Sequence, residues 1–159
     1  MKYLSVDPGT QKIGVAVWDI TDGELKLMYS SPYTLRSKDL GARYNDLYDT
    51  IVNDIETYRP EHLVCEAGFV GPNRATSLIL AGSRAITHMA AHRHKITYSE
   101  LTPATVKKLA TGRGNAKKLD VRKAMHALCS DWWLRTEDEA DAIAIGYAYG
   151  LILGGKLCS

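Results

Sequence analysis

Four carboxylates in this chain stand where chemistry on a phosphodiester would require them. Asp7 and Glu66 each follow a short apolar run, residues 3–6 and residues 63–65, of a composition typical of interior strands. Ligand sites in α/β sheets lie at the carboxyl ends of the strands. We therefore expect both side chains to emerge at one edge of a sheet.

The other two acids, Asp138 and Asp141, lie three residues apart at the start of a helical pattern. Residues at this spacing are neighbours on one helix face. Each acid taken singly has an ordinary explanation: a turn aspartate at Asp7, a surface acid at Glu66, or helix-start acids favoured by the helix dipole. Four acids that converge from three segments repel one another unless cations neutralise them. The combination therefore favours a metal site.

The type of ligand indicates which metal and which reaction. Carboxylate oxygens are hard ligands that select magnesium or manganese over zinc. Two such cations about 4 Å apart can activate a water molecule and stabilise both the attacking and the departing oxygen of an in-line displacement. The four acids thus indicate two-metal hydrolysis of a phosphodiester.

Length and composition limit the class of protein. The chain has 159 residues, of which 45% are hydrophobic, and this suits one domain spanning residues 1–159. Its apolar runs are too short to span a membrane, and Met1 and Lys2 lead directly into a predicted strand instead of a signal peptide. We expect a soluble, cytoplasmic protein with no membrane association. Cys65, Cys129 and Cys158 show no CxxC spacing, so we expect reduced thiols and no zinc finger.

The formal net charge is only +2, but basic residues are concentrated in one stretch of the chain. This stretch includes residues 111–115, a glycine-containing turn whose backbone amides can approach phosphates closely. A solvated helical face is the alternative for such a cluster. Two divalent cations on the four acids would add four charges and raise the formal charge from +2 to +6, which favours a polyanionic partner. The basic residues are Lys107, Lys108, Arg113, Lys117, Lys118, Arg122 and Lys123.

Hydrophobic periodicity and turn residues predict a mixed sheet of five strands, three antiparallel followed by two parallel, with helices on both faces. The expected strands are residues 2–7, 13–19, 24–29, 63–66 and 95–99. The expected helices are one through residues 44–55 that ends before Pro60, one capped by Asn73, one that starts at Thr102-Pro103, one at residues 117–129, and one that starts at the capping box Thr136–Glu139 and ends before Gly154.

Motifs in four places resemble the RuvC family of Holliday junction resolvases. They are Val6-Asp7-Pro8-Gly9-Thr10 with Ile13-Gly14, Cys65-Glu66-Ala67-Gly68-Phe69, Thr105-Val106-Lys107 with residues 112–118, and Glu137-Asp138-Glu139-Ala140-Asp141-Ala142. They occur in the family's order over nearly the whole chain. The resemblance implies an α/β ribonuclease-H-like fold. It also implies a homodimeric, magnesium-dependent endonuclease that makes paired nicks in branched DNA, at a four-way junction.

The resemblance also implies roles for individual residues. Asp7, Glu66, Asp138 and Asp141 correspond to catalytic ligands of two Mg²⁺ ions, for which Mn²⁺ can substitute. Lys107 and Lys118 match family positions near the reacting phosphate, and Lys118 is the stronger candidate for a catalytic role. The remaining candidates for DNA binding are Lys108, Arg113, Lys117 and Arg122.

Phe69 is the only phenylalanine in the chain and corresponds to a family aromatic that stacks on an exposed base. Burial in the core is the alternative, although Gly68 and Gly71-Pro72 place it in a loop. The same glycines make this loop differ from the family pattern. The helix from Asn73 to His92 carries small residues that allow a second helix to approach, within the domain or across a dimer axis.

Two other classes share part of this pattern. The opening Asp7-Pro8-Gly9-Thr10 also resembles YqgF-type ribonuclease-H-like proteins, which act in RNA processing. It further resembles the phosphate turn of ATPases of the actin and sugar-kinase type, but that class needs a second large domain. A non-catalytic junction-binding module is a third possibility, against which the full set of acids argues. Branch-migration partners leave no signature in the residues.

Overall fold

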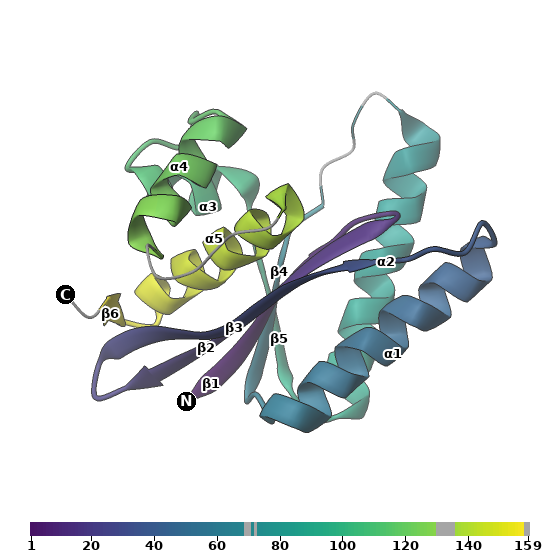
Figure 1. Cartoon of the computed structure of the whole chain (residues 1–159), viewed down its shortest axis with the longest axis horizontal. Helices are drawn as coiled ribbons and strands as arrows, with labels where there is room; N and C mark the ends of the chain where they lie inside the picture. Colours follow the sequence, from purple (N-terminus) through teal and green to yellow (C-terminus); the bar gives the residue numbers. More distant parts are fainter. Residues whose placement is uncertain (69–70, 72, 130–135, 158–159) are drawn as a thin grey trace.

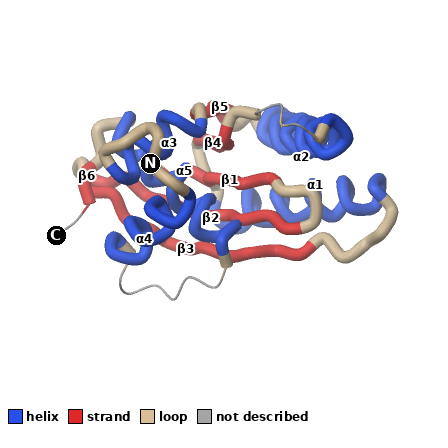
Figure 2. Tube along the Cα trace, turned by 90° about the horizontal axis from the view of Figure 1, so that it is seen from above, coloured by secondary structure: helices blue, strands red, loops and turns tan. Residues whose placement is uncertain are grey.

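The sheet is built from a three-stranded antiparallel meander extended by two parallel strands. In the computed structural model, which describes residues 1–68, 71, 73–129 and 136–157, the meander comprises β1 (Lys2–Pro8), β2 (Lys12–Thr21) and β3 (Glu24–Thr34). Strands β4 (His62–Glu66) and β5 (Thr97–Leu101) lie parallel beyond β1. The order is β5-β4-β1-β2-β3-β6, and β5 to β3 can be followed from top to bottom in Figure 2. The predicted five-stranded arrangement is confirmed.

Two details of the sheet differ from the prediction. Strand β6 (Lys156–Leu157) adds a sixth, parallel strand next to β3, and two residues are too few to show an alternating pattern in sequence. Strand β5 begins two residues later than expected. Lys95 has a φ of 58° and lies in the turn that follows the preceding helix, so it cannot be part of the strand.

Helices cover both faces of the sheet, as predicted (Figure 1). Helices α1 (Leu40–Tyr58) and α2 (Arg74–Arg93) enclose one core with alternate strand residues such as Leu4 and Val15. Helices α3 (Pro103–Thr111), α4 (Lys118–Leu128) and α5 (Glu137–Ile152) enclose the other core, which includes Tyr3 and Trp18. Successive strand residues point to opposite faces, so one sheet supports both cores.

The predicted helix starts are confirmed by their capping bonds. The Asn73 side chain accepts a hydrogen bond from the Thr76 N–H at 3.1 Å, and Thr102 caps α3 through the Thr105 N–H at 3.2 Å. The Thr136 hydroxyl oxygen accepts from the Glu139 N–H at 3.2 Å. Side-chain oxygens at these positions satisfy amides that the first helical turn leaves unpaired.

Helix α5 is fixed to β1 by two buried hydrogen bonds. Ser5 Oγ donates to the Ala142 carbonyl oxygen at 2.7 Å, and the Tyr3 hydroxyl donates to the Gly146 carbonyl oxygen at 2.8 Å. Both donors come from β1, the strand that ends in Asp7 and Pro8. The position of the α5 N-terminus relative to the end of β1 is thereby determined. In the described parts of the chain, no helix is both long enough and apolar enough to cross a bilayer.

The fold also contains a buried acid, Asp54, whose titration should be visible in the stability of the protein. Tyr33 donates a hydrogen bond to Oδ1 at 3.2 Å, whereas Oδ2 is buried with no hydrogen-bond partner among the described residues. Burial raises the pKa of Asp54 to about 6, against the opposing effect of the Tyr33 bond. The ionised form is therefore the unfavourable one in the folded protein.

Replacing Asp54 by Asn should stabilise the protein at neutral pH and not in acid. Because the folded pKa lies above the unfolded one, the wild type loses stability as pH rises from about 4 through 6, on the order of 2 kcal/mol. Denaturant unfolding across this range should show Asp54→Asn more stable above pH 6 and equal to the wild type near pH 4. The exposed Asp49→Asn, on the same helix, should show no such pH-dependent difference. An Asp54→Asn effect that is the same at every pH would contradict this account.

Candidate active site

Asp7 and Glu66 lie at adjacent strand ends, as the sequence predicts. Strands β1 and β4 are parallel, and Val6 pairs with Cys65, so the next residue on each strand is an acid. Asp7, Glu66 and Asp141 together line a cavity of about 230 Å³ that also contains Lys107 and Lys118. Two strands and three helices thus contribute charged side chains to one space.

Asp138 reaches this region through the packing of α5 on β2. Gly14 pairs with Asp7 across the β1–β2 ladder, and a Cβ atom on Gly14 would overlap the Asp138 carbonyl oxygen. Only glycine therefore lets the first turn of α5 touch the sheet beside Asp7. Asp138 does not line the cavity, but its charge raises the pKa of both Asp7 and Asp141. Asp138 is thus predictable from the sequence as a site residue, whereas the role of Gly14 is not.

The carboxylates are held in surroundings that disfavour their negative charge. Burial, followed by the charges of Asp141 and Glu66, raises the pKa of Asp7 to about 7. Burial and the Asp141 charge also raise the pKa of Glu66, and burial raises that of Asp141. Clustered acids with raised pKa values are typical of functional sites and of sites that take up cations.

Lys118 is the cation in closest contact with these acids. Its Nζ lies 2.7 Å from Asp141 Oδ2, although the lysine side chain remains largely exposed at 61%. Burial opposes ionisation of Lys118, but the hydrogen bond and charge of Asp141 and the charge of Asp7 raise its pKa. Lys107, at the wall of the same cavity, lowers the pKa of Glu66. Lys118 therefore stands beside the acids as a protonated group.

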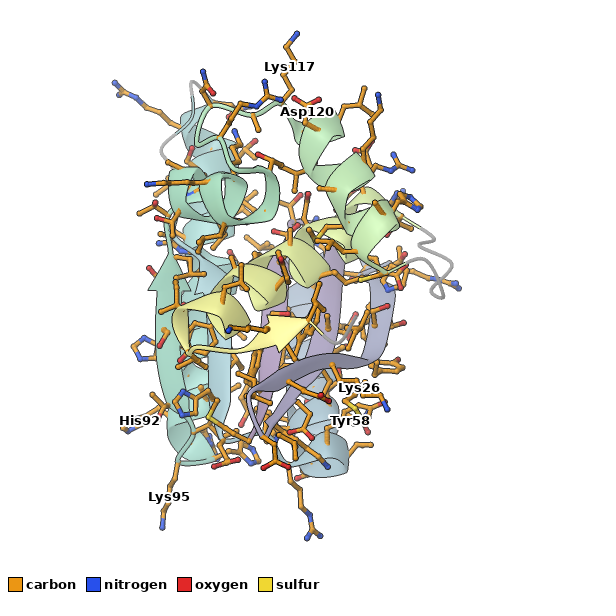
Figure 3. The ribbon with its side chains drawn as sticks, turned by 90° about the vertical axis from the view of Figure 1, so that its left-hand side faces the viewer. Lys26, Tyr58, His92, Lys95, Lys117 and Asp120 are labelled. Carbon is orange, nitrogen blue, oxygen red and sulfur yellow. The ribbon has the colours of Figure 1, made fainter. Side chains whose placement is uncertain are left out.

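The other basic candidates do not line this cavity. Arg122 Nη1 contacts Glu137 Oε1 at 3.1 Å, and Lys108 and Arg113 are exposed on and after α3. Lys117 precedes α4, where its N–H donates to Asp120 at 3.1 Å, and Figure 3 shows its side chain projecting away from the molecule. Phe69 lies outside the described residues.

Two basic features escaped the sequence analysis. A second cavity, of about 430 Å³, adjoins Asp7 and Glu66 on the α2 side, and Arg84 is the one cation among its described lining residues. Arg84 occupies the middle of α2, where an isolated arginine gives no signal in sequence. A further cavity of about 430 Å³ is lined by Gln11, Lys12, Thr34, Leu35, Arg36, Ser37, Lys38 and Arg43. Its basic residues, Lys12, Arg36, Lys38 and Arg43, come from segments of the sequence in which basic residues are not concentrated.

The donor chemistry of the acidic cluster suits Mg²⁺ or Mn²⁺, because every candidate ligand is a hard carboxylate oxygen. Within the described residues, no three His, Cys, Asp or Glu side chains are arranged closely enough to hold a metal ion unaided. The three acids in the cavity face a common space without closing around a point. One of the candidate ligand oxygens, Asp141 Oδ2, is in contact with Lys118 Nζ.

Comparisons with known proteins show which family this chain resembles. A family model described as crossover junction endodeoxyribonuclease RuvC matches residues 3–149. The protein of that name from Carboxydothermus hydrogenoformans is 31% identical over 165 residues, covering 99% of this chain and 100% of the relative. Its namesake from Rickettsia africae is 34% identical, covering 92% of this chain and 95% of the relative.

A solved structure shows the same fold. The structure of T. thermophilus RuvC in complex with Holliday junction substrate matches with a TM-score of 0.86 at 18% identity, covering 97% of this chain and 95% of that chain. The predicted ribonuclease-H-like fold is therefore confirmed, with one additional short strand. Because the family model spans most of the sequence, the chain belongs to the crossover junction endodeoxyribonuclease family RuvC.

Proposed function

We propose that this protein is a metal-dependent endodeoxyribonuclease that resolves four-way DNA junctions, with residues 1–159 acting as one catalytic domain. The observation that carries the proposal is the convergence of Asp7, Glu66 and Asp141 on one cavity with Lys107 and Lys118, in a chain of the RuvC family. The T. thermophilus relative was solved with a Holliday junction substrate. A role in DNA recombination and repair follows from this activity.

Asp7, Glu66, Asp138 and Asp141 would hold two Mg²⁺ ions, with Mn²⁺ as a substitute. When bound, such cations activate a water molecule and stabilise the attacking and departing oxygens at phosphorus. The raised pKa values of Asp7, Glu66 and Asp141 support this assignment, because a neighbouring cation would relieve the repulsion that disfavours ionisation.

The lysines of the cavity would act directly on the DNA phosphate. A protonated Nζ of Lys118 would donate to a phosphate oxygen on which negative charge develops. Lys107, which lines the cavity from α3, would bind the same DNA backbone. Lys108, Arg113, Lys117 and Arg122 would contact flanking phosphates as a basic surface along α3 and α4. Phe69 would stack on a base at the branch point, a contact worth about 1–3 kcal/mol.

Paired nicks require two active sites related by symmetry, so we propose a two-fold homodimer. Helix α2 supplies the supporting observation. Leu78 is 73% exposed and Met89 is 46% exposed, at positions that share one side of the helix with the exposed Ala81 and Ala85. An apolar stripe of this kind suits contact with the same helix of a second copy.

The experiment that tests the proposal compares substrates under one condition. Labelled four-way DNA junction, linear duplex of the same sequence and structured RNA should be incubated with the protein and Mg²⁺. We expect cleavage of the junction at least about 10²-fold faster than of either other substrate, a difference of about 2.7 kcal/mol in transition-state free energy. Preferred cleavage of RNA would support the RNA-processing alternative instead. Tight junction binding without cleavage of any substrate would support a binding module.

A further inference from the structure

We infer that Arg84 is a phosphate-binding residue for the DNA strand, seated in the cavity on the α2 side of Asp7 and Glu66. This inference rests on the proposed function and adds to it a second point of phosphate contact, across the acids from Lys107 and Lys118. None of the four motifs that resemble the family includes Arg84.

The position of Arg84 is determined by a glycine. A Cβ atom on Gly68 would overlap Nη1 and Cζ of the Arg84 guanidinium, so the group occupies space that only a glycine leaves open. Gly68 lies two residues beyond Glu66, and its φ is not in the left-handed region. The absence of a side chain at Gly68 thus makes room for the Arg84 guanidinium.

Among the residues that the structure describes, none is a partner that accounts for the placement of the Arg84 guanidinium. Arg84 makes no hydrogen bond or ion pair within the described residues, and its Nε is buried with no acceptor. Asn73 and Ser77, which line the same cavity, are engaged in the cap of α2 and in a bond from the Gly71 N–H. A half-buried cation without a partner is costly, and an anion in the cavity would remove that cost.

The neighbouring carboxylates do not serve as that anion. The cations that lower the pKa of Glu66 are Lys107 and Lys118, which stand in the other cavity. Asp7 and Glu66 line both cavities and so form the wall between the two lysines and Arg84. A DNA backbone that crosses this wall would meet a cation on either side of the acids. A guanidinium is suited to the second site because it can bind two phosphate oxygens at once.

The test measures how DNA affinity depends on salt in a cleavage-deficient Asp7→Asn background. Arg84→Met should reduce the slope of log affinity against log salt on linear duplex by about 0.9, which is roughly an eight-fold loss of affinity at about 0.1 M salt. Its unfolding temperature should not fall, because the substitution removes an unpartnered charge. Arg93→Met is the matched control, since this exposed arginine is the last residue of α2 and does not line the cavity. It should leave both slope and affinity unchanged.

Gly68→Ala provides a second variant that keeps every charge. It should displace the guanidinium and lower both affinity and slope as Arg84→Met does. An unchanged salt slope in Arg84→Met would overturn the inference, and so would an equal change of the slope in Arg93→Met. If Arg84→Met does not fold, an unchanged DNA affinity in Gly68→Ala would overturn it. Because duplex binding does not depend on junction cleavage, a normal Arg84 effect without junction cleavage would refute only the proposed function.

Discussion

Asp7→Asn should abolish cleavage while leaving junction binding intact. The charges of Asp141 and Glu66 act on Asp7 in the shared cavity, and Asp7→Asn would remove one negatively charged ligand from the proposed metal site. We expect turnover to fall by at least about 10³-fold, the scale reached by losing one strong transition-state contact. Junction affinity, measured by fluorescence anisotropy, should stay the same or increase, because less negative charge faces the phosphate.

Folding provides an internal control for this variant. In metal-free buffer at neutral pH, Asp7→Asn should unfold at the same temperature as the wild type or higher, because burial and neighbouring acids disfavour ionised Asp7. Asp22→Asn is the matched substitution, since Asp22 is an exposed residue of the β2–β3 turn with a φ of 55°, which Asn tolerates. It should leave cleavage unchanged. Cleavage by Asp7→Asn within ten-fold of the wild type would remove Asp7 from the mechanism.

Lys118→Met should separate turnover from binding. The protonated Nζ is held 2.7 Å from Asp141 Oδ2 in the cavity where, in the proposed mechanism, charge would develop on the phosphate. We expect turnover to fall by about 10²-fold, as is typical when one electrostatic donor is removed. Affinity should fall by only about eight-fold at about 0.1 M salt, the effect of one lost phosphate contact. Single-turnover kinetics and anisotropy on the same junction measure the two quantities.

The neighbouring lysine supplies the control for Lys118→Met. Lys117 carries the same charge one residue earlier, but its side chain projects away from the molecule and does not line the cavity (Figure 3). Lys117→Met should therefore affect affinity and turnover by the same small factor. If the two variants lose turnover equally, Lys118 acts only as part of a general basic surface.

The sequence was sufficient to predict the strand-end acids, because their placement depends on local signals. A buried apolar run followed by an acid predicts the position of Asp7 and Glu66 with no knowledge of the tertiary structure. Helix starts were predictable for the same reason, since Asn73, Thr102 and Thr136 cap through bonds to residues three positions away.

Features that depend on contacts between distant segments were not predictable. Strand β6 exists only because β3 offers an unpaired edge to Lys156 and Leu157. The position of the Arg84 guanidinium depends on Gly68, which is 16 positions away in the chain and lies outside α2. The Lys118–Asp141 contact likewise joins α4 to α5. Periodicity and capping contain no information about such pairs.

The most direct test of the proposed mechanism is single-turnover cleavage of a four-way DNA junction labelled on two opposed strands, with Mg²⁺ and with a chelator. A metal-dependent dimer should nick both labelled strands at symmetry-related positions, and no product should form in the chelator. Robust cleavage in the chelator would contradict the assignment of Asp7, Glu66, Asp138 and Asp141 as ligands of catalytic cations. Nicking confined to one strand would contradict the paired active sites of the proposed dimer.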